Sequence, residues 1–116
     1  VLTNAKMLVE SWGGTLVVVI IPTREEVYRG ITTHFMPAET LDSLAAPRKT
    51  VLGLCQDIQL ACYDPTDALY ELAATSQALY YPDDMHLNAA GNTALTALLT
   101  DWLRGLNLIP DMEATS

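Results

Sequence analysis

The apolar residues of this chain recur mostly at the three- and four-residue spacing of helices, and short β-branched runs interrupt this pattern. Residues 4–12 place Met7, Leu8 and Trp12 on one side, and the pair of glycines that follows provides the left-handed stop that helices favour. Residues 15–21 form a β-branched apolar run without alternation. Such a run predicts a central strand that is covered on both faces in a parallel sheet.

Capping signals, glycines and prolines set the boundaries of the segments that come next. Thr23 and Glu26 have the spacing of a capping box, which predicts a short helix that continues through Tyr28. Helical and strand periodicity are both lost over residues 30–47, where one glycine and two prolines punctuate the chain. We expect a long loop there, which would form the wall or lid of a cleft.

The second half of the chain alternates again between helical and strand patterns. Helices are expected over residues 48–56, 67–76 and 89–104, with Thr66 and Asn88 as the N-caps of the last two. Short strands are expected over residues 58–63 and 78–81. In the final helix the apolar residues form one continuous column, which is composed of Ala90, Ala94, Leu98 and Trp102.

Alternation of helices and strands predicts an α/β fold, with three layers in the order α/β/α and a mainly parallel sheet. Residues 1–109 are expected to form the carboxyl-terminal part of a single domain, and residues 110–116 a flexible tail. The first residues already have helical spacing and do not begin with methionine. We therefore expect that further sequence precedes them in the natural protein.

Composition and charge narrow the classes of partner. Fourteen acidic against six basic residues give a net charge of −8, which would repel nucleic acid and anionic membrane surfaces. The longest apolar run, residues 16–21, is too short to cross a bilayer. Cys55 and Cys62 lie in apolar stretches typical of buried thiols, and they form no zinc-ligand grouping with the histidines. We expect no metal and no cofactor. The sequence does not select a cellular compartment, and an extracytoplasmic location is one of the alternatives.

The residues best suited to chemistry lie in the segment 82–87, between the last expected strand and the last expected helix. Ligands of open α/β sheets gather at the carboxyl ends of strands, and this segment has such a position. It contains Asp83, Asp84 and His86. A histidine that a carboxylate orients can act as a general base. The alternative interpretation is that aspartate and asparagine serve here only as turn formers and caps.

A family resemblance favours the catalytic interpretation. Residues 80–91, YYPDDMHLNAAG, resemble the last conserved block of SGNH (GDSL-type) hydrolases, and residues 21–28, IPTREEVY, are similar to a segment of SGNH proteins related to polysaccharide O-acetylation. The resemblance covers most of the chain. It implies a flavodoxin-like fold and an esterase or acyltransferase that acts on small acyl esters such as acetyl esters, with carbohydrate esters among the substrates.

The resemblance leaves two aspartates as candidate partners of His86. The common hydrolase spacing selects Asp83, three residues before the histidine, whereas the alginate-acetylation-like relatives use the aspartate two residues before it, which is Asp84. The tyrosine-tyrosine-proline context favours Asp84 slightly. Substrate-binding roles are assigned to Arg24, His34 and Tyr81, each with a plain surface or structural role as the alternative.

The departures from the family concern the nucleophile. The Gly-Asp-Ser motif and the glycine and asparagine of the oxyanion hole are absent, and Ser11, Ser43 and Ser76 have no better claim to the role. Without these groups the chain alone is not expected to hydrolyse esters. We expect it to associate with itself or with a missing amino-terminal half, because a truncated sheet exposes a strand edge and apolar faces.

Three readings of the function follow. The first is a hydrolase, and the second is a transferase in which a sugar hydroxyl replaces water as acyl acceptor. The third is a non-catalytic α/β binding module that has lost its nucleophile. A receiver-like domain is disfavoured, because no phosphate-binding glycine loop and no acidic pair after a first strand occur.

Overall fold

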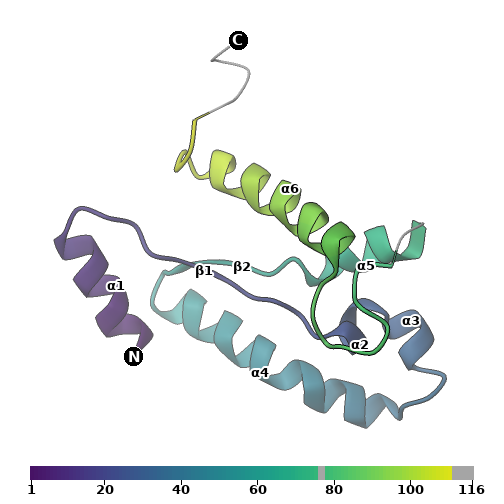
Figure 1. The fold of residues 1–116 in the computed structure, drawn as a ribbon. Helices are drawn as coiled ribbons and strands as arrows, with labels where there is room; N and C mark the ends of the chain where they lie inside the picture. The colour runs from purple at the N-terminus through teal and green to yellow at the C-terminus, as the bar shows by residue number, and fades with distance from the viewer. Residues whose placement is uncertain (76–77, 111–116) are drawn as a thin grey trace.

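The computed structural model describes residues 1–75 and 78–110 (Figure 1). Its helices are α1 (Leu2–Ser11), α2 (Arg24–Val27), α3 (Arg29–Thr32), α4 (Ala38–Asp57), α5 (Thr66–Thr75) and α6 (Ala89–Gly105), and its strands are β1 (Val17–Val19) and β2 (Ala61–Tyr63). The expected tail, residues 110–116, lies outside the described residues except for Pro110, as does the end of the helix expected to reach residue 76.

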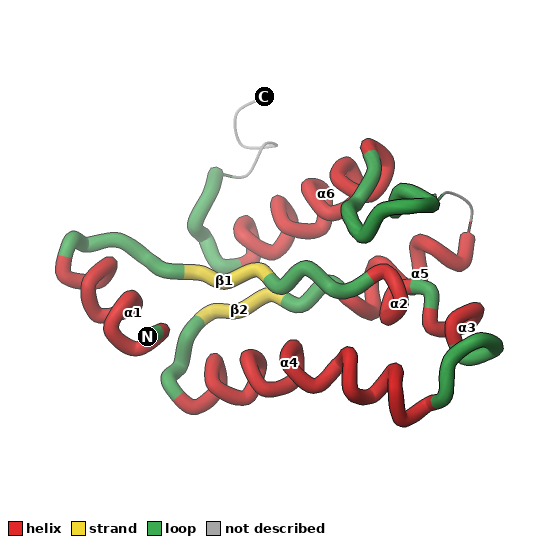
Figure 2. Tube along the Cα trace, turned by 60° about the horizontal axis from the view of Figure 1, so that its bottom comes forward, coloured by secondary structure: helices red, strands yellow, loops and turns green. Residues whose placement is uncertain are grey.

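The sheet consists of β1 and β2, which run parallel with Val18 opposite Cys62 (Figure 2). The side chains of adjacent residues in a strand point to opposite faces of the sheet. Two adjacent side chains of β2 contact two different helices. Cys62 is bonded to α4, and the ring of Tyr63 stacks on Trp102 of α6 with 5.2 Å between the ring centroids. Helices α4 and α6 therefore contact opposite faces of β2.

The prediction of a three-layer, flavodoxin-like fold with a mainly parallel sheet is wrong. Within the described residues the sheet has two strands, and most of the chain is helical. The strand expected at residues 78–81 is reduced to an isolated antiparallel bridge between Tyr80 and Leu87. Its backbone groups are used locally, since Leu79 accepts a hydrogen bond from the Asn88 N–H at 2.8 Å and Tyr81 donates one to the His86 carbonyl.

The strand expected over residues 15–21 exists but is neither long nor central. β1 has three residues, all of them half-buried. The Ile20 N–H continues the pairing by donating to the Tyr63 carbonyl at 2.9 Å. No strand among the described residues pairs with the other edge of β1, so β1 is an edge strand and not a central one.

The prediction of a long loop over residues 30–47 is also wrong for most of that range. Helix α3 and the first half of α4 occupy it, and Pro47 lies inside α4. Residues 38–46 contain alanine, leucine and glutamate, which are strong helix formers. These propensities prevail although the later proline removes one backbone donor from the helix.

Two of the three predicted N-caps and the predicted helix stop are confirmed. Thr23 and Glu26 form a capping box at the start of α2. The Asn88 side chain caps α6 by accepting a hydrogen bond from the Gly91 N–H at 2.9 Å. Gly13 adopts a φ of 79° just after α1, as expected for the left-handed stop. These signals are local, so the surrounding fold does not alter them.

The two cysteines form a disulfide, so the expectation of buried thiols is wrong. Cys55 lies near the end of α4 and Cys62 lies in β2, with their Cα atoms 6.2 Å apart. The chain reverses between them at Gln59, which has a positive φ of 55°. The apolar surroundings of both residues are compatible with either state, and the turn between helix and strand brings the sulfurs together.

An ionic cluster joins α4, α2 and the segment that follows β2. Arg48 donates to Glu26 at 2.6 Å through Nε and to Asp64 at 2.7 Å through Nη1. The Asp64 carboxylate also accepts hydrogen bonds from the backbone and hydroxyl of Thr66. Thr66, which was expected as the N-cap, is instead the first residue of α5, and its N–H and hydroxyl are bound by Asp64.

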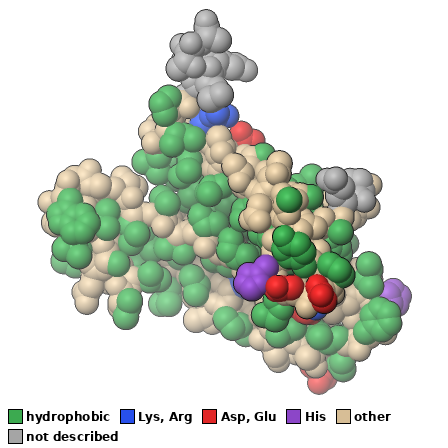
Figure 3. Space-filling model, viewed as in Figure 1, with side chains coloured by type: hydrophobic (Ala, Val, Ile, Leu, Met, Phe, Trp, Pro, Cys, Tyr) green, Lys and Arg blue, Asp and Glu red, His purple; other side chains and the backbone are tan. Residues whose placement is uncertain are grey.

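The hydrophobic core lies beneath the segment that carries the histidine. Its buried residues are Val27 of α2, Leu69 of α5, and Leu79 and Tyr80, which precede the histidine. The alanines and leucine of the α6 column pack against them. By contrast, α1 buries no residue, and Trp12 is 72% exposed. Apolar side chains consequently cover much of the face in Figure 3. No helix in the described part of the chain is long and apolar enough to span a membrane.

Substitution of Gly91 by alanine is expected to destabilise the protein by about 3 kcal/mol, at the upper end of the usual overpacking cost. A Cβ there would overlap the Leu79 carbonyl oxygen and lie 2.8 Å from Leu87 Cδ2, so α6 would have to move from the loop. Gly53→Ala in α4 is the control, since a Cβ there meets nothing within 4 Å. It is expected to stabilise by about 0.5–1 kcal/mol in urea unfolding. Equal stability of the two variants would contradict the close approach of α6.

Candidate functional site

The candidate site is the segment between Leu79 and Asn88, which is held at both ends by hydrogen bonds to the core. The Leu79 N–H donates to the Tyr28 hydroxyl at 2.8 Å. The Asn88 side-chain amide donates to the Ala78 carbonyl at 2.8 Å. The ends of the loop are therefore anchored while its tip, residues 81–86, remains exposed.

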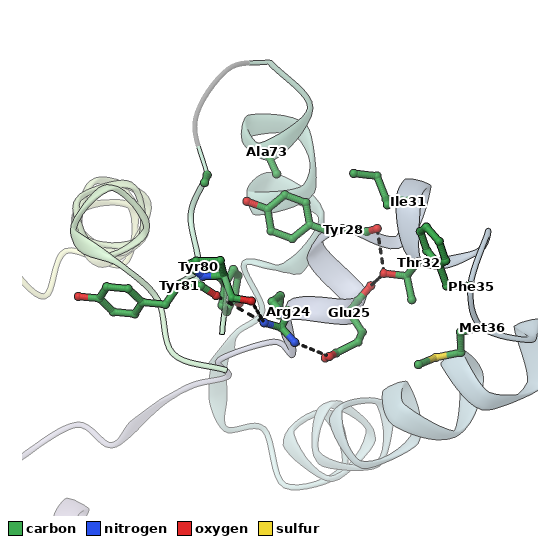
Figure 4. A pocket seen from close by; sticks show the side chains of 12 residues that line it. Arg24, Glu25, Tyr28, Ile31, Thr32, Phe35, Met36, Ala73, Tyr80 and Tyr81 are labelled. Carbon is green, nitrogen blue, oxygen red and sulfur yellow. Dashed lines mark hydrogen bonds and ion pairs between the residues drawn. The ribbon is translucent and has the colours of Figure 1, made fainter. Parts of the chain in front are cut away.

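Arg24 fastens the tip of this loop from α2. Its Nη1 donates to the carbonyl oxygens of Tyr81 and Pro82 at 3.4 and 3.2 Å (Figure 4). The same atom donates to the Asp84 carbonyl oxygen at 3.3 Å. Its Nη2 pairs with Glu25 at 3.5 Å. A substrate-binding role was predicted for Arg24, and the structure shows its guanidinium engaged with the protein's own backbone.

His86 and Asp84 form a hydrogen-bonded pair. The Nδ1 atom of His86 lies 2.5 Å from Oδ1 of Asp84, and the same oxygen accepts the His86 backbone N–H at 3.1 Å. The hydrogen bond from the His86 ring, followed by that from its backbone, lowers the pKa of Asp84 below its ordinary value of 3.8. Asp83 is exposed in the same loop, and no hydrogen bond within the described residues joins it to His86.

The pair lies at the surface, with 83% of the His86 side chain and 51% of the Asp84 side chain exposed. With Nδ1 directed at the carboxylate, Nε2 is the ring nitrogen that can accept a proton from a hydroxyl group. An exposed ion pair contributes little to folding stability. The arrangement suits proton transfer to or from a group that approaches the loop from outside.

The other predicted site residues are not gathered around His86. Tyr81 is half exposed and lines a cavity together with Arg24, and in Figure 4 its ring points away from Phe35 and Met36. His34 is exposed beyond the end of α3 and does not line this cavity. The two histidines are well separated on the face that Figure 3 displays.

Tyr80 and Tyr81 have opposite environments, as alternation along an extended segment predicts. Tyr80 is 3% exposed and donates its hydroxyl hydrogen to the Pro22 carbonyl at 2.9 Å. Burial, followed by the electrostatic influence of Tyr28, raises the pKa of Tyr80 to about 12. Its phenol is therefore neutral and structural at physiological pH.

The serine side chains that the structure describes have local partners. Ser11 donates to the Leu8 carbonyl and Ser43 to the Glu39 carbonyl, both within their own helices. Ser76 lies outside the described residues. In the described part of the chain no three histidine, cysteine or acidic side chains are grouped to hold a metal ion.

A cleft wall was expected over residues 30–47, but several individual residues that line the cavity beside the loop were not singled out. They are Tyr28, between α2 and α3, Ile31 of α3, and Phe35 and Met36 in the turn that follows α3. Ile31 and Phe35 have the four-residue spacing of one helix face, which is a usable signal. The glycine and two prolines within residues 30–47 obscure this spacing.

Comparisons with known proteins add no assignment, since no family model, curated protein or solved structure matches the chain. The resemblance of residues 80–91 to the SGNH block, and the catalytic roles that it implies, stay predictions.

Proposed function

We propose that His86 and Asp84 are the general-base pair of an SGNH-type acyl esterase. The observation that carries this proposal is the 2.5 Å contact between His86 Nδ1 and Asp84 Oδ1. The sequence context, residues 80–91, supports it through its resemblance to the last block of those enzymes. The substrates are small acyl esters such as acetyl esters, including those of carbohydrates.

The mechanism requires a serine hydroxyl from another segment or chain. Asp84 orients the imidazole and stabilises its protonated form, and Nε2 takes the serine proton as the oxygen attacks the ester carbonyl. The same nitrogen then returns the proton to the departing alcohol. In the second half of the cycle Nε2 activates either water or a sugar hydroxyl, which makes the enzyme a hydrolase or a transferase.

The second candidate function, O-acyl transfer, is supported by residues 21–28, which are similar to a segment of polysaccharide O-acetylation proteins. Acetylated sugar formed when an acceptor oligosaccharide is added to the ester would favour transfer. Release of free acetate at the same rate with and without acceptor would favour hydrolysis. A binding module without catalysis would yield neither product.

The surface of the chain supports docking of the segment that supplies the serine, or self-association. One edge of β1 has no partner strand among the described residues, and α1 keeps Met7 and Trp12 exposed. Unpaired edges and apolar faces favour association. The Cys55–Cys62 disulfide is typical of oxidising compartments, which supports an extracytoplasmic location.

The orienting role of Asp84 is tested by a matched pair of substitutions. In the polypeptide encoded by the complete reading frame, Asp84→Asn is expected to lower turnover of 4-nitrophenyl acetate by about ten- to a hundredfold. Water screens the half-exposed carboxylate, which keeps the effect below that of a buried triad. Asp83→Asn removes the same charge from the neighbouring position and is expected to change turnover by less than about twofold.

The two variants separate orientation from simple loss of negative charge. An equal loss in both would show that the loop's charge, and not the hydrogen bond to His86, matters. A loss confined to Asp83→Asn would overturn the assignment of the pair. Complete absence of ester turnover in the parent polypeptide, with and without an acceptor sugar, would leave the non-catalytic binding module as the function.

A further inference from the structure

A cavity of about 760 Å³ lies between α2, α3 and the loop that carries the histidine (Figure 4). Its volume is in the range of small-molecule binding sites, about 300–1,000 Å³. The wall is mainly apolar and aromatic. The side chains that matter for the argument are those of Tyr28, Ile31, Phe35, Met36 and Ala73.

The polar groups in this wall already have partners within the protein. The Thr32 hydroxyl lies 3.0 Å from the carbonyl oxygens of both Glu25 and Tyr28. The Tyr28 hydroxyl accepts the Leu79 N–H, and the Tyr80 hydroxyl donates to the Pro22 carbonyl. A ligand would therefore be held mainly by apolar contact, with little penalty from unpaired polar atoms.

Charge at the cavity is balanced. Arg24 and Glu25, the two ionisable residues of opposite sign in the wall, pair with each other at 3.5 Å. The Nη1 atom of Arg24 also donates hydrogen bonds to carbonyl oxygens of the histidine loop. An uncharged ligand fits this environment better than a carboxylate or a phosphate.

The cavity wall continues into the candidate catalytic loop. Tyr81 and Pro82 line the cavity, and two residues further along the chain Asp84 contacts His86. Arg24 contributes to the cavity wall and also holds the histidine loop, because its side chain lines the cavity and donates a hydrogen bond to the Asp84 carbonyl. The cavity and the loop that carries His86 therefore share the side chain of Arg24.

We infer that this cavity binds an uncharged, medium-length acyl chain, so that the substrate class extends from acetyl esters to esters of longer fatty acids. The identification of the bound chain as part of an ester substrate rests on the proposed function. Binding of the chain to the cavity does not require catalysis. Ile31 and Phe35 are 60% and 85% exposed, and the bound chain would cover their apolar surface.

Binding is measured with two unreactive amides, N-ethylacetamide and N-ethylhexanamide, and the protein labelled with ¹³C at its methionine methyl groups. Each added methylene is expected to tighten binding by about two- to fourfold. The Met36 methyl resonance should shift, because Met36 lines the cavity. The Met7 resonance, from the exposed side of α1, should not.

Phe35→Ser is expected to weaken binding of the hexanamide by about tenfold or more, since it removes a large apolar side chain from the wall. Because the Phe35 side chain is highly exposed, its substitution is not expected to disturb folding. Leu54→Ser is the control, because Leu54 is also exposed, at 47%, and lies on α4 outside the cavity. It should leave the affinity unchanged.

The outcomes distinguish the cavity from the catalytic proposal. Equal affinity for the two amides, or a Met36 resonance that does not respond, would overturn the acyl site even if acetyl esters are turned over. Length-dependent binding without any ester turnover would retain the cavity as an acyl-chain site and reject the catalytic pair. His86→Ala should strongly reduce turnover and leave binding of the hexanamide intact.

Discussion

Replacement of His86 by alanine is expected to reduce kcat for 4-nitrophenyl acetate by about 10²- to 10⁴-fold in the polypeptide from the complete reading frame. The reason is that Nδ1 of His86 contacts Asp84, which leaves Nε2 as the ring nitrogen that can take a proton from a hydroxyl group. Because 83% of the His86 side chain is exposed, its removal should not alter folding. Circular dichroism and thermal unfolding should match those of the parent.

The control is His34→Ala, which removes the chain's other histidine from an exposed position beyond α3. Its kcat is expected to stay within about twofold of the parent, because exposed substitutions remote from a site have small effects. Similar losses in both variants would point to a general effect of histidine removal. Unchanged turnover in His86→Ala would refute the general-base assignment, whatever the behaviour of the aspartate variants.

Arg48→Met is expected to lower the free energy of unfolding by about 3–5 kcal/mol, the range for a buried ion pair that loses one partner. Glu26 is 4% exposed, and its carboxylate would be left without its cation. Asp64 would lose its bond to Arg48 Nη1 as well. Urea unfolding followed by circular dichroism measures the change.

Two comparisons make this prediction specific. Lys6→Met breaks an exposed i,i+4 pair with Glu10 and is expected to cost only about 0.3–0.5 kcal/mol. Glu26→Gln added to Arg48→Met should recover part of the loss, because it removes the buried charge. A cost for Arg48→Met as small as that for Lys6→Met would show that the cluster does not hold the helices together.

The cluster also has a pH signature. Burial opposes ionisation of Asp64, but hydrogen bonds from Thr66 and from Arg48 outweigh it and lower the pKa of Asp64 below its ordinary value of 3.8. A lowered carboxylate pKa stabilises the folded state above the unfolded-state pKa and ceases to do so as the pH falls through the folded-state pKa. The parent should therefore lose stability below about pH 4, and Arg48→Met should lose less over the same interval.

The ionic cluster and the candidate site are linked through α2. Glu26, on the side of α2 held by Arg48, and Arg24, which fastens the histidine loop, lie two residues apart on this four-residue helix. Loss of the cluster is thus expected to loosen the loop as well as the core. In an activity assay this appears as a lower kcat for Arg48→Met at temperatures where the protein remains folded.

Local signals in the sequence predicted local structure well. The capping box of Thr23 and Glu26, the Asn88 cap and the helix stop at Gly13 all form as expected. Each depends on side chains within three residues of the groups that they contact, so no distant segment can change them. The sequence left Asp83 and Asp84 open as partners of His86, and the contact that forms is the one with Asp84, two residues earlier.

What depended on distant segments was not predictable from spacing. The β-branched run that contains β1 indicated a central strand, yet the sheet has two strands because residues 79–81 bond to their own loop and to α2. The disulfide depends on the turn at Gln59, and the cavity depends on α3 and the loop coming together.

The sequence by itself therefore determined the capping box of α2, the N-cap of α6 and the left-handed stop after α1. Tertiary structure alone decided the number of strands, the disulfide, the buried cluster around Arg48 and the use of Arg24 as a clamp on the loop. The physical reason is that backbone and charged groups can form hydrogen bonds or ion pairs of similar strength with several partners. The packing of distant segments determines which of these partners is close enough.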